Sequence, residues 1–417
     1  MSLRPVACTF RLVAVLCLVC TATAARADFA SAMAEFEAGR YESSAREFER
    51  LAWLGLAQAQ SNVALLYANG QGVARSPGKA AAWARIAAQS GDPKARELYL
   101  KILPMLGSAD VDESVALERA YQAVALELQV NFDKRVQVGT PAKRLSKIDD
   151  IYPPAALSEG WEGYVYLLVV VDEQGKSRDP QVLISNPPGK FDAATVEALL
   201  GARWEPASFE GNPVASYACL RLLFQFSGEG DTQGVAKMVR QLRERADSGD
   251  ASSQFAGAVL WIAYRDAANR ISEEEAQRWM AAALEAQFPP ALLMAVTCGV
   301  DSAYGERARE IARSYGGKEL LMAARRGSPP AQVLVARELL AAEQLDLAAR
   351  TRRAIGWLEL AGAGPQPWQA RIQLAHLLAT TPVAELRDPA RARSLYQPLR
   401  RTWGFHPLMK DTAAALK

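Results

Sequence analysis

Apolar residues recur at helical spacing over two long stretches of the chain, 28–100 and 235–417. Near the start of the first stretch, Phe29, Met33 and Phe36 follow the i, i+4, i+7 spacing that places side chains on one face of a helix. Both stretches are rich in alanine, whose small side chain lets helices pack closely. The pattern predicts short amphipathic helices on both sides of a different middle segment.

One hairpin repeat can be followed between Ala59 and Ala95. Small residues let its two helices approach, an aromatic side chain from each helix fills the gap between them, and two glycines allow the turn. This segment closely resembles the SEL-like repeat, a relative of the tetratricopeptide repeat. The residues to which we assign structural roles in the repeat are Tyr67, Gly70, Gly72, Trp83 and Gly91.

The C-terminal stretch follows the same layout more loosely. Four alanines that each open a helical pattern are spaced by 40, 40 and 39 residues, namely Ala251, Ala291, Ala331 and Ala370. An Ala-x-x-Trp pattern also recurs, ending at Trp279 and at Trp357. The Gly-x-Gly-Val turn of the first hairpin does not recur. We therefore predict a solenoid of degenerate SEL-like or tetratricopeptide-like hairpins over 235–417.

Between about 146 and 228 the periodicity changes from helical to strand-like. β-branched and aromatic residues alternate there between inward and outward positions, and turn residues separate the runs. Two strands, a helix and a last strand are predicted in this order at 164–172, 177–185, 191–200 and about 214–226. The middle segment is therefore expected to form a small α+β domain.

Six short motifs in this segment, each weak alone, occur together and in order. They are Tyr152-Pro153-Pro154, Gly163-Tyr164-Val165, Val171-Asp172 with Gly175, Phe191-Asp192-Ala193-Ala194, Trp204-Glu205-Pro206-Ala207 and Gly211-Asn212-Pro213-Val214. Together they resemble the C-terminal domain of TonB, the periplasmic module of the transducer that drives outer-membrane uptake. Residues 146–228 are thus expected to form a TonB C-terminal-like domain.

The resemblance implies that this domain binds a short extended peptide, the TonB box of an outer-membrane receptor, by adding a strand to its sheet. A sheet edge offers backbone donors and acceptors, so main-chain hydrogen bonds supply affinity. By analogy we assign the binding edge to the last strand, with Tyr217, Cys219, Arg221, Leu223 and Gln225 as candidate residues. The alternative is that Tyr217 and Arg221 belong to an ordinary solvated face.

Residues 1–27 have a basic flank, a short apolar centre and an Ala-x-Ala exit, which are typical of a cleavable secretory signal peptide. Cleavage would remove three arginines and no acid, changing the net charge from +2 to −1. This balance argues against nucleic acid as a partner. We expect the mature protein in the periplasm, or anchored in the inner membrane if the signal is retained.

Cleavage would also leave Cys219 and Cys298 as the remaining cysteines. They could pair in an oxidising compartment, but they lie in different predicted domains, so we expect two separately buried thiols. The chain has two histidines, His376 and His406, which argues against a multi-histidine metal centre. No nucleophile elbow or complete phosphate loop occurs, and after the expected signal peptide, which contains Cys17 and Cys20, there is no Cys-x-x-Cys. We therefore expect no catalytic residues, no metal, no cofactor, no small-molecule substrate and no enzymatic activity.

The sequence as a whole predicts an α+β multidomain protein, with helical repeat solenoids on both sides of a small TonB-like domain of two strands, a helix and a strand. The expected segments are a signal peptide at 1–27, SEL-like repeats at 28–100, a helical linker at 101–145, the TonB-like domain at 146–228 and degenerate repeats at 235–417. The predicted function is binding of an envelope or outer-membrane protein. The alternative is a divergent component of TonB-dependent transport.

Overall fold

The structure is a computed structural model of the 417-residue chain. It describes residues 23–89, 93–125, 140–146, 152–224, 232–263, 270–297, 302–316, 318–343, 345–364 and 367–417. The chain forms two compact units. The sheet unit lies within Asp133–Tyr315, and the repeat unit combines Thr21–Phe132 with Gly316–Lys417.

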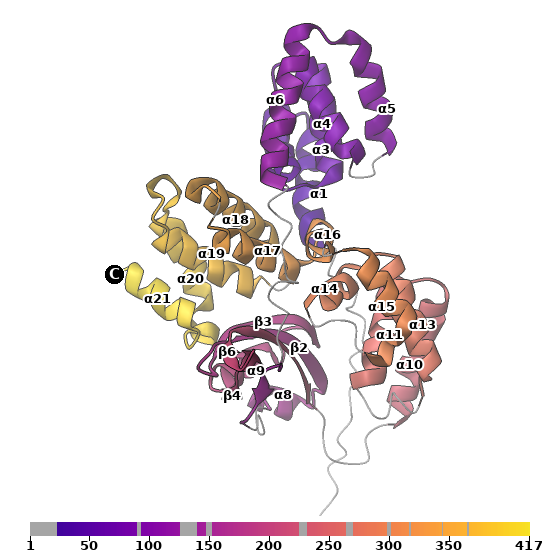
Figure 1. The fold of residues 1–417 in the computed structure, drawn as a ribbon, viewed down its shortest axis with the longest axis vertical. Coiled ribbons are helices and arrows are strands. Elements are labelled where there is room, and N and C mark those ends of the chain that lie inside the picture. Colours follow the sequence, from indigo (N-terminus) through magenta and orange to yellow (C-terminus); the bar gives the residue numbers. More distant parts are fainter. Residues whose placement is uncertain are drawn as a thin grey trace, which may run out of the picture. The chain divides into compact units, whose positions relative to one another are not determined.

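The sheet unit contains seven described strands and the helices that pack on them (Figure 1). Its strands are β1 (Lys143–Arg144), β2 (Gly163–Val171), β3 (Ser177–Asn186), β4 (Trp204–Glu205), β5 (Ala207–Phe209), β6 (Asn212–Val214) and β7 (Ser216–Phe224). Its helices are α8 (Pro154–Glu159), α9 (Asp192–Leu200), α10 (Thr232–Asp247), α11 (Ala251–Ala263), α13 (Glu273–Glu285), α14 (Pro289–Thr297), η4 (Ser302–Tyr304) and α15 (Gly305–Ser314).

The described part of the repeat unit is helical throughout (Figure 1). Its N-terminal helices are α1 (Thr23–Glu37), α2 (Tyr41–Trp53), α3 (Ala57–Asn69), α4 (Pro77–Gln89), α5 (Pro93–Ile102), η2 (Leu103–Met105) and α6 (Ser108–Ala125). Its C-terminal helices are α16 (Glu319–Arg325), α17 (Pro329–Ala341), α18 (Leu347–Gly362), α19 (Trp368–Thr380), η5 (Ala384–Leu386), α20 (Pro389–Trp403) and α21 (Pro407–Ala415).

A buried glutamine makes the same contact in three hairpins. Gln60, Gln254 and Gln332 each donate through Nε2 to a backbone carbonyl eight residues earlier, at 3.1, 3.0 and 3.0 Å. The glycine that ends the preceding helix has a φ of 89°, 93° and 88° in these hairpins. The carbonyls and glycines are Ala52 and Gly55, Ala246 and Gly249, and Ala324 and Gly327. The N-terminal and C-terminal helices therefore share one repeat geometry.

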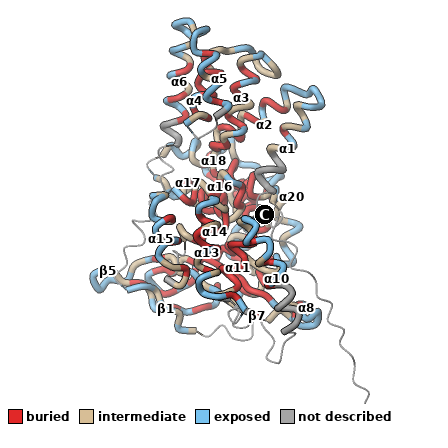
Figure 2. Tube along the Cα trace, turned by 90° about the vertical axis from the view of Figure 1, so that its right-hand side faces the viewer, coloured by how far each residue is buried: buried red, intermediate tan, exposed pale blue. Residues whose placement is uncertain are grey.

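The repeat alanines and tryptophans lie where the sequence pattern places them. Ala291, Ala331 and Ala370 are buried near the start of a helix, and Ala251 is the first residue of α11. Trp279 and Trp357 are each 1% exposed in their hairpins. Figure 2 shows the same alternation of buried and exposed faces along these helices. The predicted helical repeats on both sides of the middle segment are confirmed.

The main sheet has the strand order β3-β2-β7, and both pairings are antiparallel. The β2–β3 hairpin, α9 and β7 confirm the predicted order of two strands, a helix and a strand. The last strand begins later than predicted, because β6 pairs with β5 and the chain leaves the strand conformation at Ala215 before β7. A second small pairing joins β1 to β4.

The predicted helical linker at 101–145 is partly wrong. Helix α6 occupies its first half, but Lys143 and Arg144 form strand β1, which pairs with Glu205 and Trp204. Thr140 also bridges to Ser208. The helical expectation failed here because two-residue pairings are set by tertiary contacts rather than by periodicity.

Helices α10 to α15 share one apolar core with the sheet. Tyr164 and Tyr166 of β2 are buried in a cluster with Leu242, Phe255 and Trp279 of the helical layer. Ile184 of β3 packs against the same cluster, and α14 contacts β3. The sheet is thus covered by α9 on one face and by repeat helices on the other. For this reason the sheet unit continues to Tyr315, past the domain boundary that the sequence predicts near residue 230.

The N-terminal and C-terminal helices of the repeat unit contact each other directly. Arg50 Nη1 donates to Gly356 O at 3.4 Å, and Arg353 Nη2 donates to Trp53 O at 3.3 Å. Gly356 lies so close to Leu54 that an added Cβ would meet its Cδ2 at 3.3 Å. These contacts join helices that are about 300 residues apart in the sequence into one stack.

Among the described residues no single helix combines the length and apolarity needed to span a membrane. The helix pair α13 and α14 passes on length and composition together, but it bends by 102° at its break. Residues 1–22 of the expected signal peptide lie outside the described residues, and α1 begins at Thr23.

Candidate peptide-binding edge of the sheet

The central strand β2 is buried along nearly its whole length. On the α9 side, Phe191 stacks on Phe224 of β7 with ring centroids 4.2 Å apart, and Tyr152 meets both rings edge-on. Gly163 is required at the start of β2, because an added Cβ would meet Asn186 O at 2.0 Å. These contacts fix both edge strands against β2.

The turn between β2 and β3 is built around Asp172. Its Oδ1 accepts from the amides of Gln174 and Lys176 at 3.1 and 2.8 Å, and its Oδ2 accepts from Arg178 Nε at 2.9 Å. Burial raises the pKa of this carboxyl, but the Lys176 amide and the Arg178 guanidinium outweigh burial and hold the pKa below its usual value. The turn therefore has an ionised carboxylate at neutral pH.

The β3 edge is irregular. Its pairing with β2 shifts register twice, between Tyr166 and Leu167 and between Leu168 and Val170. Asp179 has a positive φ of 43°, and Pro180, next in the strand, has no backbone N–H to donate. Bulges and prolines are features that protect sheet edges from pairing with another chain.

The β7 edge is regular. All nine of its residues pair with β2 without a shift, from Ser216 opposite Val171 to Phe224 opposite Gly163. Within the described residues β2 is its one strand neighbour. Its outer backbone row therefore has the geometry that a further antiparallel or parallel strand needs.

The candidate residues on β7 lie on the face toward the helical layer. Residues directly opposite each other in a ladder point to the same face. Arg221 lies opposite Tyr166 and Cys219 opposite Leu168, so both share the face that carries the Tyr164–Tyr166 cluster. Arg221 is exposed, and its Nη1 donates to Ile262 O at the end of α11 at 3.0 Å. Tyr217 is partly buried on the same face.

Cys219 departs from the sequence expectation. It is exposed on β7 and is disulfide-bonded, whereas we expected a separately buried thiol. The expectation treated the two predicted domains as separate in space, whereas the sheet and the helical layer share one core. Cys298, whose state was the other half of this expectation, lies outside the described residues, as does the partner sulfur of Cys219.

Two further candidates, Gln225 of the last strand and Gly91 of the repeat, lie outside the described residues. Leu223 is paired with Tyr164 through the backbone of β7.

The repeat residues build one turn of the N-terminal hairpins. Gly70 ends α3 in the left-handed region. Gly72 has a φ of 69°, and an added Cβ would meet Tyr41 O at 2.1 Å. Tyr67 and Trp83 are 8% and 1% exposed, and Trp83 packs edge-on against Trp53. The turn thus needs glycine both for its backbone conformation and for the close approach of α2.

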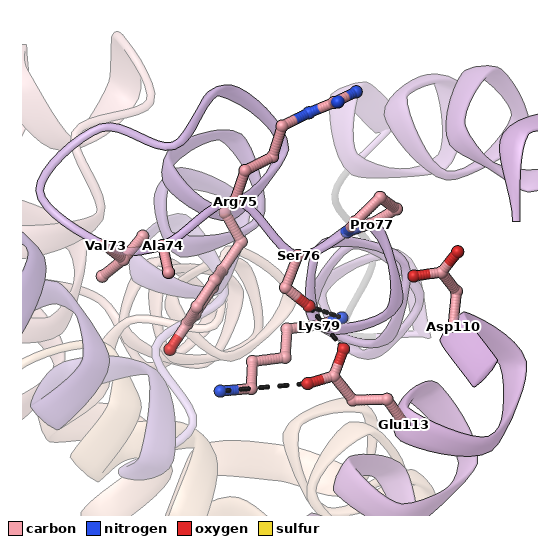
Figure 3. A pocket seen from close by; sticks show the side chains of 9 residues that line it. Val73, Ala74, Arg75, Ser76, Pro77, Lys79, Asp110 and Glu113 are labelled. Carbon is pink, nitrogen blue, oxygen red and sulfur yellow. Dashed lines mark hydrogen bonds and ion pairs between the residues drawn. The ribbon is translucent and has the colours of Figure 1, made fainter.

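A cavity of about 470 Å³ opens beside this turn (Figure 3). The polar side chains that line it are bonded to one another or to a neighbour. Ser76 Oγ donates to Glu113 at 2.5 Å, and the Lys79 ammonium lies 4.0 Å from the Glu113 carboxylate and 5.1 Å from the centre of the Tyr67 ring. Burial and the Glu49 carboxylate, which accepts from the Tyr67 hydroxyl, raise the pKa of Tyr67. This network stabilises the repeat turn.

Among the described residues, no group of three or more histidine, cysteine, aspartate or glutamate side chains is arranged to hold a metal ion. His406 is buried and serves as N-cap of α21, accepting from Leu408 N through Nδ1 at 3.3 Å. His376 Nδ1 lies 3.5 Å from Thr412 Oγ1. Both histidines thus contact helix α21.

Comparison with known proteins gives the middle segment a family. The family model of the Gram-negative bacterial TonB protein C-terminal matches residues 150–226. The solution NMR structure of the Pseudomonas aeruginosa TonB C-terminal domain is 30% identical, covering 23% of this chain and 95% of that one, with a TM-score of 0.20. None of the curated proteins compared with the chain matches it.

Two repeat proteins match along most of the chain. A Sel1 repeat protein from Oxalobacter formigenes is 18% identical, covering 94% of this chain and 87% of its own, with a TM-score of 0.30. A protective antigen of uropathogenic Escherichia coli with an SLR fold is 13% identical, covering 94% and 79%, with a TM-score of 0.29. Through residues 150–226, the chain belongs to the TonB C-terminal family of Gram-negative bacteria.

Proposed function

We propose that this protein is an exported, non-enzymatic binding protein of the Gram-negative envelope, and that its TonB-like domain receives an extended segment of an envelope protein as an added strand on β7. The family match supports a protein-binding role of the periplasmic type. The helical repeats are of a kind that presents surfaces to protein partners.

The observation that carries the proposal is the contrast between the two sheet edges. An incoming strand needs an uninterrupted row of backbone groups, which β7 offers over nine paired residues and β3 interrupts with Pro180 and its register shifts. The side chains of Tyr217, Cys219 and Arg221 lie on the face toward the helical layer, so strand addition occurs in the plane of the sheet and leaves that face in place. Affinity then comes mainly from main-chain bonds.

A panel of extended peptides from the periplasmic N-terminal segments of outer-membrane receptors tests this directly. We expect at least one peptide to bind the full chain with its Cys219 disulfide intact. Two matched versions of that peptide, N-methylated at alternate residues, should differ in affinity. Methylation of the amides that face β7 abolishes binding, whereas methylation of the other amides leaves binding intact. Equal binding of both versions would exclude strand addition.

The second candidate function is a component of TonB-dependent transport, which the family match favours by analogy. N-terminal labelling of the native protein distinguishes the two. Asp28 as the first residue supports the exported binding protein, whereas an intact Met1 held in the membrane supports the transducer.

A further inference from the structure

The repeat unit has two ends, and they differ in polarity. At the C-terminal end, α20 exposes Arg391, Arg393, Arg400 and Arg401, and no large apolar side chain is exposed among the described residues after Leu347. At the other end, α5, η2 and α6 expose five of the eleven exposed large apolar side chains of the described chain. These five are Leu100, Leu103, Met105, Val111 and Val115. We call them the α5–α6 patch.

A repeat stack needs a polar outer face on each terminal repeat, because every inner repeat buries its apolar faces against a neighbour. The α20 end meets this requirement and the α5–α6 end does not. Leu103 and Met105 are 46% and 62% exposed in η2, between the two helices. Helices α5 and α6 both pack on α4. Their exposed sides carry apolar residues, as the faces of an inner repeat do where a neighbouring repeat covers them.

The charges at this end are divided between the two helices. Helix α5 exposes three basic residues and one acidic residue, namely Lys94, Arg96, Lys101 and Glu97. In the first turns of α6, Asp112 is exposed, whereas Asp110 and Glu113 line the cavity beside the α3–α4 turn. A two-fold axis between the helices would place α5 of one copy against α6 of the other, pairing basic with acidic residues twice. An acidic first turn makes an anionic lipid surface the poorer partner.

We propose that the α5–α6 patch is a docking surface for the same end of a second copy of this chain. The two copies continue the repeat stack through an isologous contact, with Leu103 and Met105 at its centre and Lys101 facing Asp112 of the partner copy. The proposal does not depend on the function assigned to β7.

Sedimentation velocity of the full chain, from about 1 to about 100 micromolar, tests the proposal. We expect a concentration-dependent dimer. Leu103→Glu with Met105→Glu should weaken it at least about a hundredfold, because the contact would bury unpaired charges. Both side chains are exposed, so the fold should be retained. Leu347→Glu, at an exposed apolar position elsewhere in the repeat unit, is the control and should leave the dimer unchanged.

Charge variants test the orientation. Lys101→Glu and Asp112→Lys should each weaken the dimer by about tenfold, and their combination should restore it. A chain that stays monomeric throughout the concentration range would overturn the proposal. So would a dimer that survives the Leu103→Glu and Met105→Glu changes. A monomer that sediments with phosphatidylglycerol vesicles through the same residues would show that lipid, rather than a second copy, covers the patch.

Discussion

The two edges of the main sheet belong to one small domain, yet they are built in opposite ways. On β3, Asp179 has a positive φ and Pro180 removes a donor, and the pairing with β2 shifts twice. On β7 the pairing is continuous, and one face of the strand is fastened to the helical layer by Arg221. A regular edge is a liability in a soluble protein unless it is used. The difference is the reason for proposing β7, rather than β3, as the edge that receives a strand.

The largest effect should come from proline on β7. Leu222→Pro and Leu223→Pro each remove one backbone N–H, and because donors alternate along a strand, one of the two points outward. That variant should keep its fold and lose binding of the selected peptide by at least about a hundredfold. Circular dichroism checks the fold, and fluorescence anisotropy measures the binding.

The matched control uses the other edge. Ile184→Pro and Ser185→Pro remove neighbouring donors from β3, and the variant that keeps its fold should bind the peptide as the unaltered chain does. Loss of binding through β3, with β7 prolines tolerated, would reverse the assignment of the two edges.

The Cys219 disulfide gives the next largest effect. Cys219→Ser should lower the free energy of unfolding of the sheet unit by about 2 to 4 kcal/mol. We expect the partner to be Cys298, which follows α14, the helix that contacts β3. Chemical denaturation followed by tryptophan fluorescence measures the loss.

Peptide mapping without reductant identifies the partner. Cys298→Ser should match Cys219→Ser in stability. A free Cys219 thiol in the native protein, or a crosslink to a different cysteine, would contradict this prediction.

A smaller, pH-dependent effect is expected at the turn that holds β3. Asp172→Ala should cost about 1 to 2 kcal/mol at neutral pH, because two amides and a guanidinium lose their acceptor. The folded-state pKa of Asp172 lies below its unfolded value, so this stabilisation is present above about pH 4 and is lost as pH falls through the lower value. Unfolding curves of both proteins should therefore converge in acid; a constant difference down to low pH would show that the charge is not involved.

The smallest effect concerns the contact between β7 and α11. Arg221→Ala removes one exposed bond to Ile262 O and should cost about 0.5 to 1 kcal/mol, with peptide binding unchanged. Arg178→Ala, which removes the same type of side chain from β3, is the control for this variant. A loss of binding with Arg221→Ala alone would show that this side chain, and not only the backbone, contacts the peptide.

The sequence predicts much of the sheet because its signals are local. Alternation placed β2 and β3 within a residue or two, and Phe191 with Asp192 marked the start of α9. Gly72 was identified as a turn residue, and the structure adds the close approach of Tyr41 as a second reason for glycine there.

The features that the sequence does not predict depend on contacts between residues far apart in the chain. The odd-numbered face of β7 was read as a ligand face or a solvated face, but Tyr166 and Ile184 show that this side of the sheet packs on repeat helices. A stricter signal for the repeat kinship of the two ends lies in the pattern Ala-x2-Gly-x4-Gln, which the sequence analysis did not use. It ends at Gln60, Gln254 and Gln332.

Hydrogen–deuterium exchange of the full chain with a bound extended peptide tests the central claim most directly. Strand addition to β7 predicts slower exchange of amides within 216–224, with exchange within 177–186 unchanged. Protection of 177–186 instead, or of neither segment while the peptide remains bound, would contradict the account.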